Sequence, residues 1–214
     1  PMAFIKGRNI KVEVGATNGT PVTVTAVTQA SPGVATATAH AQADATVGYF
    51  SGVSGMAQLE GQAVRVDAPV TNNFTLQGLN TTNYAAFTAG TFTPVATWQT
   101  LAECDQYDIG GGAADKIDTT CLIDIVKQEE NGLLPTQSVT LNIKATDTPS
   151  TAMALIEAAA QAGNSLVFRI TLQSGAVRVF RGEPSLAGES VQTGAVGTGS
   201  LSVAVKGFAL KLAA

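Results

Sequence analysis

The sequence predicts a mainly β protein: a β-sandwich or barrel-like domain with one flanking α-helix, plus an inserted small all-β domain. Three observations support this class. Charged residues make up 13% of the 214 residues, about half of the usual share, while Thr and Val are frequent. Several runs alternate apolar and polar residues with period two, as half-buried strands do. One segment has the spacing of a capped amphipathic helix.

Composition narrows the class further. The hydrophobic content is 45% and the formal net charge is −4, which is the opposite of the signature of disorder. No run of about 18 apolar residues is present, so a membrane-spanning helix is not expected. The first six residues, PMAFIK, do not have the pattern of a signal peptide. We therefore expect a protein made in the cytoplasm.

The N-terminal third predicts one strand followed by an insert. Residues 3–15 form the first strand, with Ile10, Val12 and Val14 on one face. From residue 22 to about 92 the chain has four charged residues among short Thr, Val and Ala runs that are separated by turn signals, which is typical of a small all-β module. We therefore expect residues 1–20 and 93–214 to form the main β-sandwich domain (the frame). Residues 21–92 are expected to form an inserted domain (the insert).

The frame resumes near Trp98 and contains a clear strand and the helix. SVTLNIK at 138–144 alternates as a half-buried strand does. Thr148 is expected to cap the helix, Pro149 to fill its first position and Gly163 to end it. The apolar stripe of this helix is Ala152, Met153, Leu155, Ile156, Ala159 and Ala160.

The most informative stretch is LVFRITLQSGAVRVFRGEPSLAG at 166–188. Phe168, Ile170 and Leu172 share one face of a strand, Ser174-Gly175 forms a turn, and a second strand ends at the corner Phe180-Arg181-Gly182. Residues 200–212 close the frame with strands, and Leu201, Val203 and Val205 alternate there with polar or small residues.

This pattern of strand, turn, strand and Phe-Arg-Gly corner resembles the major tail tube proteins of lambda-like, long-tailed bacteriophages (siphoviruses). The resemblance covers about residues 1–20 and 93–212 and is most specific from 138 to 188. The insert resembles a small β-domain that recurs in phage structural proteins. The resemblance implies a structural virion protein that forms homo-hexameric rings stacked into a tail tube.

The resemblance also implies partners and a location. The tube would assemble in the host cytoplasm around a tape-measure protein and contact tail terminator and distal tail proteins. It would reside in the virion tail, and the insert would project on the tube exterior. DNA would pass through during genome ejection without specific binding, and no membrane contact is implied.

An acidic segment at 103–130 is the most functional-looking feature. It holds eight of the 16 acidic residues of the chain and two of the 12 basic ones. It could be a solvated surface loop, and a calcium site is a weaker alternative because the D-x-D-x-D-G spacing is missing. The resemblance favours a third interpretation, a lumen or inter-ring loop that repels phosphate. The candidate residues are Asp105, Asp108, Asp115, Asp118, Asp124, Glu129 and Glu130.

Three arginines, Arg169, Arg178 and Arg181, cluster on the polar side of the hairpin. Together with the neighbouring phenylalanines they could suggest nucleic-acid binding. The chain is acidic, however, with a pI of about 4.9. We therefore expect these arginines at a subunit interface, paired with acids of an adjacent copy.

No pattern predicts a catalytic, metal or cofactor site. Two cysteines, Cys104 and Cys121, and one histidine, His40, are too few for a closed zinc site, and no nucleophile elbow is present. The two cysteines could be free thiols or could form a disulfide. Gly110-Gly111-Gly112 lies between acids, so it does not suit a phosphate. We expect neither enzymatic activity nor a cofactor.

Self-association follows from the predicted sheet edges, which are poor in charge and would pair readily with another copy. The alternative is a surface β-sandwich adhesin or carbohydrate-binding module. Such modules expose aromatic clusters, whereas 6% of this chain is aromatic and those residues are scattered.

Overall fold

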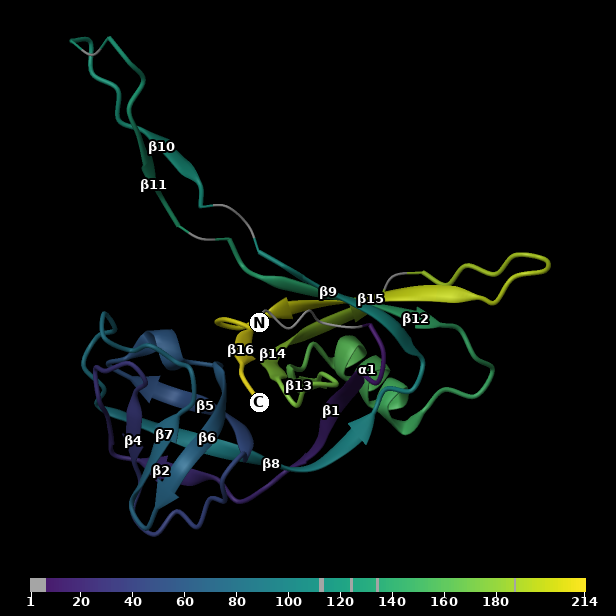
Figure 1. Cartoon of the computed structure of the whole chain (residues 1–214), viewed down its shortest axis with the longest axis horizontal. Helices are drawn as coiled ribbons and strands as arrows, with labels where there is room; N and C mark the ends of the chain where they lie inside the picture. Colours follow the sequence, from purple (N-terminus) through teal and green to yellow (C-terminus); the bar gives the residue numbers. More distant parts are fainter. Residues whose placement is uncertain (1–6, 112–113, 124, 134, 187) are drawn as a thin grey trace.

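The computed structural model describes residues 7–111, 114–123, 125–133, 135–186 and 188–214. It confirms the mainly β prediction, with 14 strands in one large curled sheet and two in a separate hairpin among these residues (Figure 1). In chain order the elements are β1 (Lys11–Asn18), β2 (Val22–Val24), β3 (Ala26–Val27), β4 (Val34–Thr36), β5 (Val47–Ser54), the 3-10 helix η1 (Ala57–Leu59), β6 (Ala63–Val70), β7 (Asn73–Leu76), β8 (Ala89–Thr100), β9 (Cys104–Gly110), β10 (Lys116–Asp118), β11 (Glu129–Asn131), β12 (Ser138–Lys144), α1 (Thr151–Ala162), β13 (Leu166–Thr171), β14 (Val177–Leu186), β15 (Thr198–Val205) and β16 (Leu210–Leu212).

The long strand β8 connects the two halves of the sheet. Its first part pairs with β2 and β5, whereas its second part pairs with β1. From β1 the sheet continues through β13, β14, β15 and β12 to β9, which is the last strand at that end of the path. The short strands β3, β4 and β7 lie at the opposite end.

Two hydrophobic cores stabilise this arrangement. The first contains the buried rings of Phe50, Phe74 and Phe92, and side chains of β13, β14 and β16 also contribute to it. Its frame members include Val179 and Leu212. The 21–92 segment therefore packs directly on the frame and shares a core with it.

The second core lies between α1 and the sheet. Its centre is the stacked pair Phe168 and Phe180, whose ring centroids are 5.2 Å apart. Side chains of β1, β12 and β15 complete it, and α1 contributes Ala152, Met153 and Ile156. Each such fully buried aliphatic or aromatic side chain stabilises the fold by about 1.5–3 kcal/mol.

The helix begins later than the sequence suggested. Ser150 is the N-cap, and its Oγ accepts a hydrogen bond from the Met153 amide at 3.2 Å. Thr148 and Pro149 therefore precede the helix, because Ser150 supplies the capping oxygen closer to the first buried turn. Gly163 ends the helix in the left-handed conformation (φ 65°), as predicted.

The hairpin of β13 and β14 is confirmed, with a turn at Gly175 (φ 85°). The expected end of the second strand at Gly182 is wrong, because β14 continues to Leu186 and changes partner. Up to Gly182 one edge of β14 pairs with β13, while the other edge pairs with β16 at Val177–Val179 and with β15 from Gly182 onward. A glycine suits this point because a side chain there would collide with the Ala204 carbonyl oxygen.

One further prediction needs correction. The first strand was expected at 3–15, but β1 spans Lys11–Asn18, and residues 3–6 lie outside the described ones. The closing segment forms the strands β15 and β16, which are separated by a turn at Gly207, where φ is 76°.

Candidate functional site

The side chains suited to catalysis or metal binding are dispersed. In the part of the chain that the structure describes, no group of three or more His, Cys, Asp or Glu could hold a metal ion. His40 is buried, its Nδ1 accepts from the Gln42 amide at 3.0 Å, and its Nε2 lies 3.1 Å from the Asn73 carbonyl oxygen. Both ring nitrogens of His40 thus contact backbone groups nearby. None of the described helices has the length and apolar character needed to cross a bilayer.

The clearest functional feature is a sheet with two unlike faces, formed by β9, β12, β15 and the C-terminal part of β14. Along β12, Val139 and Leu141 are buried, whereas Thr140 and Asn142 point to the other face. Residues directly opposite each other in an antiparallel pair share a face, so the pairing register identifies the other residues of the polar face. The polar face consists of Gln106, Asp108, Ser138, Thr140, Asn142, Lys144, Glu183, Ser185, Thr198, Ser200, Ser202 and Ala204.

The apolar face of the same sheet packs on α1 within the second core. The helix therefore covers one face and leaves the polar face open. Small hydroxyl and amide side chains dominate the polar face, and the Asn142 amide donates to Gln106 Oε1 at 3.2 Å. The carboxylate of Glu183 is paired with Lys206 at 2.8 Å.

The acidic segment is a long β-hairpin and not a loop. Its base is β9 paired with β12, and beyond Gly110 and Ser138 the chain continues as an arm, defined here as residues 111–137. The arm contains the β10–β11 ladder and projects far from the body (Figure 1). Antiparallel pairing satisfies the backbone groups that a free loop would leave to water.

The structure separates the predicted acidic residues. Asp108 lies on the polar face, and Asp105 lies at the bulge between the pairs that Cys104 and Gln106 form with β12. Asp115, Asp118, Glu129 and Glu130 belong to the arm, and Asp124 lies outside the described residues.

One cross-strand pair on the arm brings like charges together. Asp118 and Glu129 are directly opposite, an arrangement that is destabilising when nothing compensates it. Lys127 compensates, with its Nζ 2.7 Å from Glu129 Oε1 and 3.9 Å from Asp118 Oδ2. Hydrogen bonds from Thr120 lower the pKa of the Asp118 carboxyl.

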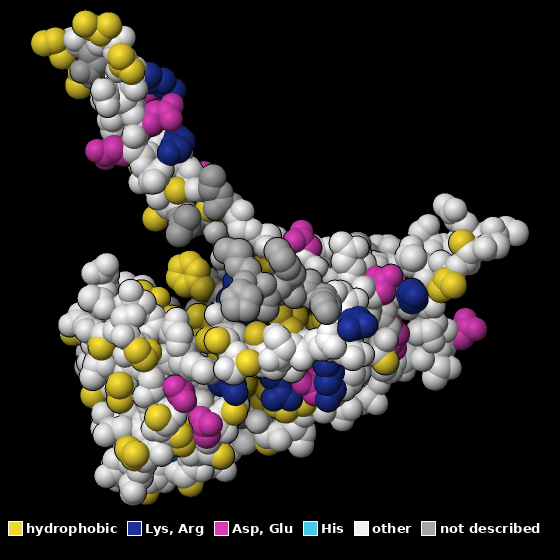
Figure 2. Space-filling model, viewed as in Figure 1, with side chains coloured by type: hydrophobic (Ala, Val, Ile, Leu, Met, Phe, Trp, Pro, Cys, Tyr) yellow, Lys and Arg dark blue, Asp and Glu magenta, His cyan; other side chains and the backbone are white. Residues whose placement is uncertain are grey.

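The outer end of the arm is apolar. The side chains of Leu122, Ile123, Ile125 and Val126, here called the apolar tip, are 110%, 88%, 101% and 69% exposed. They form the hydrophobic cluster at the far end of the arm in Figure 2. Sequence reasoning missed this cluster because it counted the acids of the segment. The available signal was the run Leu-Ile-Asp-Ile-Val.

The first predicted interface arginine is engaged within the chain. Arg169 Nη2 lies 2.8 Å from Glu13 Oε2, and Arg169 Nε donates to the same oxygen at 2.9 Å. Lys11 Nζ contacts the other oxygen of this buried carboxylate at 2.7 Å. The Arg169 guanidinium also stacks 4.3 Å above the Trp98 ring.

The other two arginines lie along β14. Arg181 stacks 4.3 Å above the Tyr49 ring, so it connects β14 to β5. Arg178 Nη1 donates to the carbonyl oxygens of Val177 and Leu212 at 3.3 and 3.4 Å. Arg178 thus contacts backbone carbonyls, whereas Arg169 and Arg181 stack on aromatic rings.

The end of the sheet away from the arm has its own ionisable groups. Two opposing effects act on the pKa of Glu103. Burial raises it, whereas hydrogen bonds, including those from the Ser150 amide (2.6 Å) and hydroxyl (2.8 Å), lower it by more, so the pKa lies below its usual value. Burial raises the pKa of the Cys104 thiol to about 11, which keeps it protonated and unreactive. Cys104 and Cys121 are not joined by a disulfide.

Comparison with known families agrees with this architecture. A family model described as phage tail tube protein (TTP) matches residues 54–209. No curated protein matches the chain. The match covers most of the chain, including the two-faced sheet, α1 and the arm. The chain therefore belongs to the phage tail tube protein family and is a structural protein of the virion tail.

Proposed function

We propose that copies of this chain close into rings, six to a ring as the resemblance implies, and that the rings stack into a tube whose bore conducts DNA during ejection. The two-faced sheet carries this proposal. One face is anchored by α1, and the other offers a row of small polar side chains. The polar face would line the bore.

The chemistry of the polar face suits a DNA conduit. Fixed cations bind phosphates strongly through counterion release, and they would hold the DNA backbone. Lys144 lies where β12 ends, and Lys206, which follows β15, reaches this face near Ala204, where its charge is paired with Glu183. The centre of the face carries Thr140, Asn142 and Ser202, with the Asp108 carboxylate beside them. The bore would be near neutral at its centre, with the acids at Asp108 and toward the arm.

Ring closure would use the sheet edge at β9. This strand ends the path, and an edge strand offers backbone groups for pairing with a neighbouring chain. Head-to-tail pairing closes into a ring when the rotation between neighbouring copies adds up to a full turn. Of the three predicted interface arginines, Arg178 is the best candidate for a neighbour's carboxylate, because Arg169 and Arg181 already stack on rings of their own chain.

The arm would reach the neighbouring ring. It extends past the body (Figure 1), and its apolar tip is an exposed cluster of the kind that marks protein contacts. Asp115, Asp118, Glu129 and Glu130 would then lie between rings. Residues 21–92 would face the exterior as a separate insert that packs on the frame through the shared core.

The remaining expectations belong to the same proposal. The tape-measure, tail terminator and distal tail proteins would contact the tube, and the chain would have no catalytic activity. The alternative of an adhesin or carbohydrate-binding module has little support, because Phe50, Phe74, Phe92, Phe168 and Phe180 are buried in the cores and cannot stack on sugars.

Electron microscopy of the purified chain at increasing concentration tests the assembly. We expect hollow tubes built of stacked rings. A chain that stays monomeric at the highest concentration would refute the proposal.

A lysine placed on the polar face tests the bore. Virions with Thr140→Lys should assemble tails of normal length but eject DNA several-fold more slowly, because each subunit adds a cation to the path of the DNA. Thr82→Lys, at an exposed position in the 21–92 segment, is the matched control and should eject at the normal rate. Equal ejection rates for the two variants would exclude Thr140 from the bore.

A further inference from the structure

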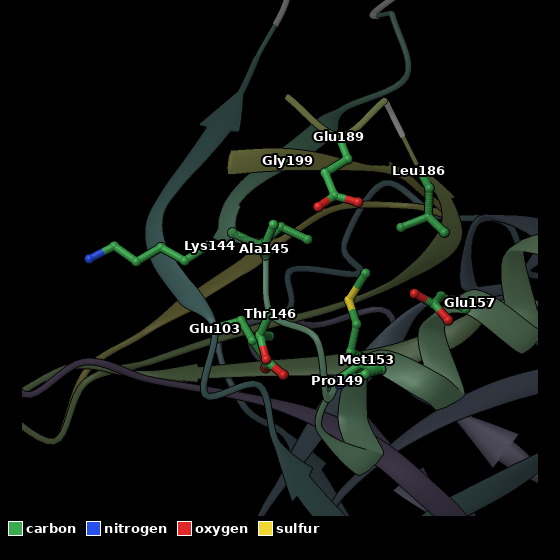
Figure 3. A pocket seen from close by; sticks show the side chains of 11 residues that line it. Glu103, Lys144, Ala145, Thr146, Pro149, Met153, Glu157, Leu186, Glu189 and Gly199 are labelled. Carbon is green, nitrogen blue, oxygen red and sulfur yellow. The ribbon is translucent and has the colours of Figure 1, made fainter. Parts of the chain in front are cut away.

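A hollow opens at the end of the sheet opposite the arm (Figure 3). Its apolar wall includes Ile143, Pro149, Met153 and Leu186, and Met153 rises into it from α1. The volume is about 180 Å³, and an apolar cavity of about 150 Å³ already admits a molecule as large as benzene. We call it the end hollow. It has room for an aliphatic side chain.

The rim of the end hollow is acidic. Glu157 on α1 and Glu189 after β14 lie at its edges, and Glu103 lies at its base, where it is already bound by Ser150. Lys144 also belongs to the rim, but its side chain extends away (Figure 3). An occupant with an aliphatic end would match the apolar wall of this hollow.

The pairing register places the end hollow and the arm at opposite ends of the same strands. On β12, Ser138 pairs with Gly110 at the start of the arm, whereas Lys144, at the other end of the strand, lines the hollow. These seven residues span about 20 Å at about 3.3 Å per residue. Copies stacked head to tail along this direction bring the arm of one against the hollow-bearing end of the next.

The apolar tip has the properties of the missing occupant. Its four aliphatic side chains are exposed, and the charge of Lys127, which follows directly, is paired with Glu129 within the arm. The 188–197 segment beside the end hollow contributes Val191 and Val196, which are also exposed. Exposed apolar side chains therefore occur at both ends of the molecule.

We propose that the end hollow receives the apolar tip of a second copy in the adjacent ring, with Leu122 as the inserted side chain. This inference rests on the proposed tube and identifies which surface of the neighbour the arm contacts. The contact is heterologous, because the tip of each copy fills the hollow of the next, so it propagates along the tube.

Cysteine cross-linking tests the contact directly. In a Cys104→Ser, Cys121→Ser background, Leu122→Cys is combined with Glu189→Cys, and tubes are oxidised mildly. We expect a ladder of covalent dimers, trimers and longer chains in denaturing gels. The matched control combines Leu122→Cys with Asn83→Cys, at an exposed position in the 21–92 segment, and should stay monomeric.

The outcomes separate the two proposals. Tubes that form but give no ladder would overturn the contact and leave the tube intact. If the unmodified chain forms no tubes, the proposed function fails. In that case covalent oligomers of the Leu122→Cys, Glu189→Cys variant in concentrated solution would still support the contact, and their absence would overturn it.

A second variant measures the strength of the contact. Leu122→Ser should raise the concentration needed for tube formation about tenfold or more, because the burial of one leucine side chain is lost. Val70→Ser, which also removes an exposed aliphatic side chain (61% exposed) but lies on β6, should leave that concentration unchanged. Equal effects of the two changes would contradict a specific role for the tip.

Discussion

The substitution Gly182→Ala tests the point at which β14 changes partners. Gly182 is opposite Leu166 of β13 and opposite Val205 of β15. On its N-terminal side the Lys206 amide donates to the Arg181 carbonyl oxygen at 2.7 Å. The two-faced sheet thus joins the rest of the frame at this residue, and its backbones lie close together here.

The structure sets the size of the effect. A Cβ at position 182 would collide with the Ala204 carbonyl oxygen and lie 2.6 Å from Val203 Cγ1. The carbonyl oxygen can move only if β15 shifts away from β14. Overpacking of this kind costs about 1–3 kcal/mol, and we expect about 3 kcal/mol because backbone must yield. For a chain of this size that lowers the Tm by about 6–12 °C.

Urea and thermal unfolding followed by circular dichroism measure this cost. Gly188→Ala is the matched control, because a Cβ there meets nothing within 4 Å, and its stability should equal that of the unmodified chain. A Gly182→Ala protein within about 0.5 kcal/mol of the unmodified chain would show that the close approach of β14 and β15 is not as described.

Three other side chains give predictions at sites far from this one. Ser150→Ala should destabilise by about 1 kcal/mol at neutral pH through loss of the cap. The pKa of Glu103 is lower in the folded chain than in the unfolded chain. The Glu103 carboxylate therefore stabilises the fold at pH values above its unfolded-state pKa, and this contribution is lost as the pH falls through its folded-state pKa. The Ser150→Ala penalty measured by urea unfolding should therefore shrink in acid, and a penalty that grows in acid would contradict this. Glu13→Ala removes a buried carboxylate between two cations and should cost about 3 kcal/mol in the same assay, whereas a loss below about 0.5 kcal/mol would mean that the pair is solvated. Gln62→Ala leaves the Phe208 amide and carbonyl without their side-chain partner and should cost about 2 kcal/mol, with faster hydrogen exchange at that amide; unchanged exchange would exclude this contact.

Local patterns were sufficient to predict the strands and the helix. Alternation predicted the β12 strand at its observed bounds, and it predicted the buried face of β13 through Phe168 and Ile170. These predictions succeed because one face of each strand packs on a core while the other carries polar groups. The C-terminus of the helix was also predictable, because Gly163 adopts the conformation that favours glycine.

Features that depend on tertiary contacts were not predictable. Arg169 was expected on the polar side of the hairpin at a subunit interface, but it forms an ion pair with the buried Glu13 and stacks on Trp98 of its own chain. The Trp98 ring of β8 covers the Arg169 guanidinium, a tertiary contact that sequence periodicity cannot show. The helix N-cap moved to Ser150 because Glu103, remote in sequence, holds that residue in place.

The candidate site was predicted in outline. The acid count located the segment that forms the arm, but it could not distinguish a loop from a hairpin, since both are polar. The polar face was missed because its members come from four strands that only the register brings together. The apolar tip exposes aliphatic side chains where a loop usually carries polar ones, and such local exceptions are expected at functional surfaces.

A cryo-electron microscopy map of the assembled tube tests the central claim most directly. We predict that Thr140, Asn142 and Ser202 face the axis in every subunit and that the surface of the bore carries few cations. A tube in which these side chains are buried between subunits or face the exterior, or a bore lined mainly by lysine and arginine, would contradict the account.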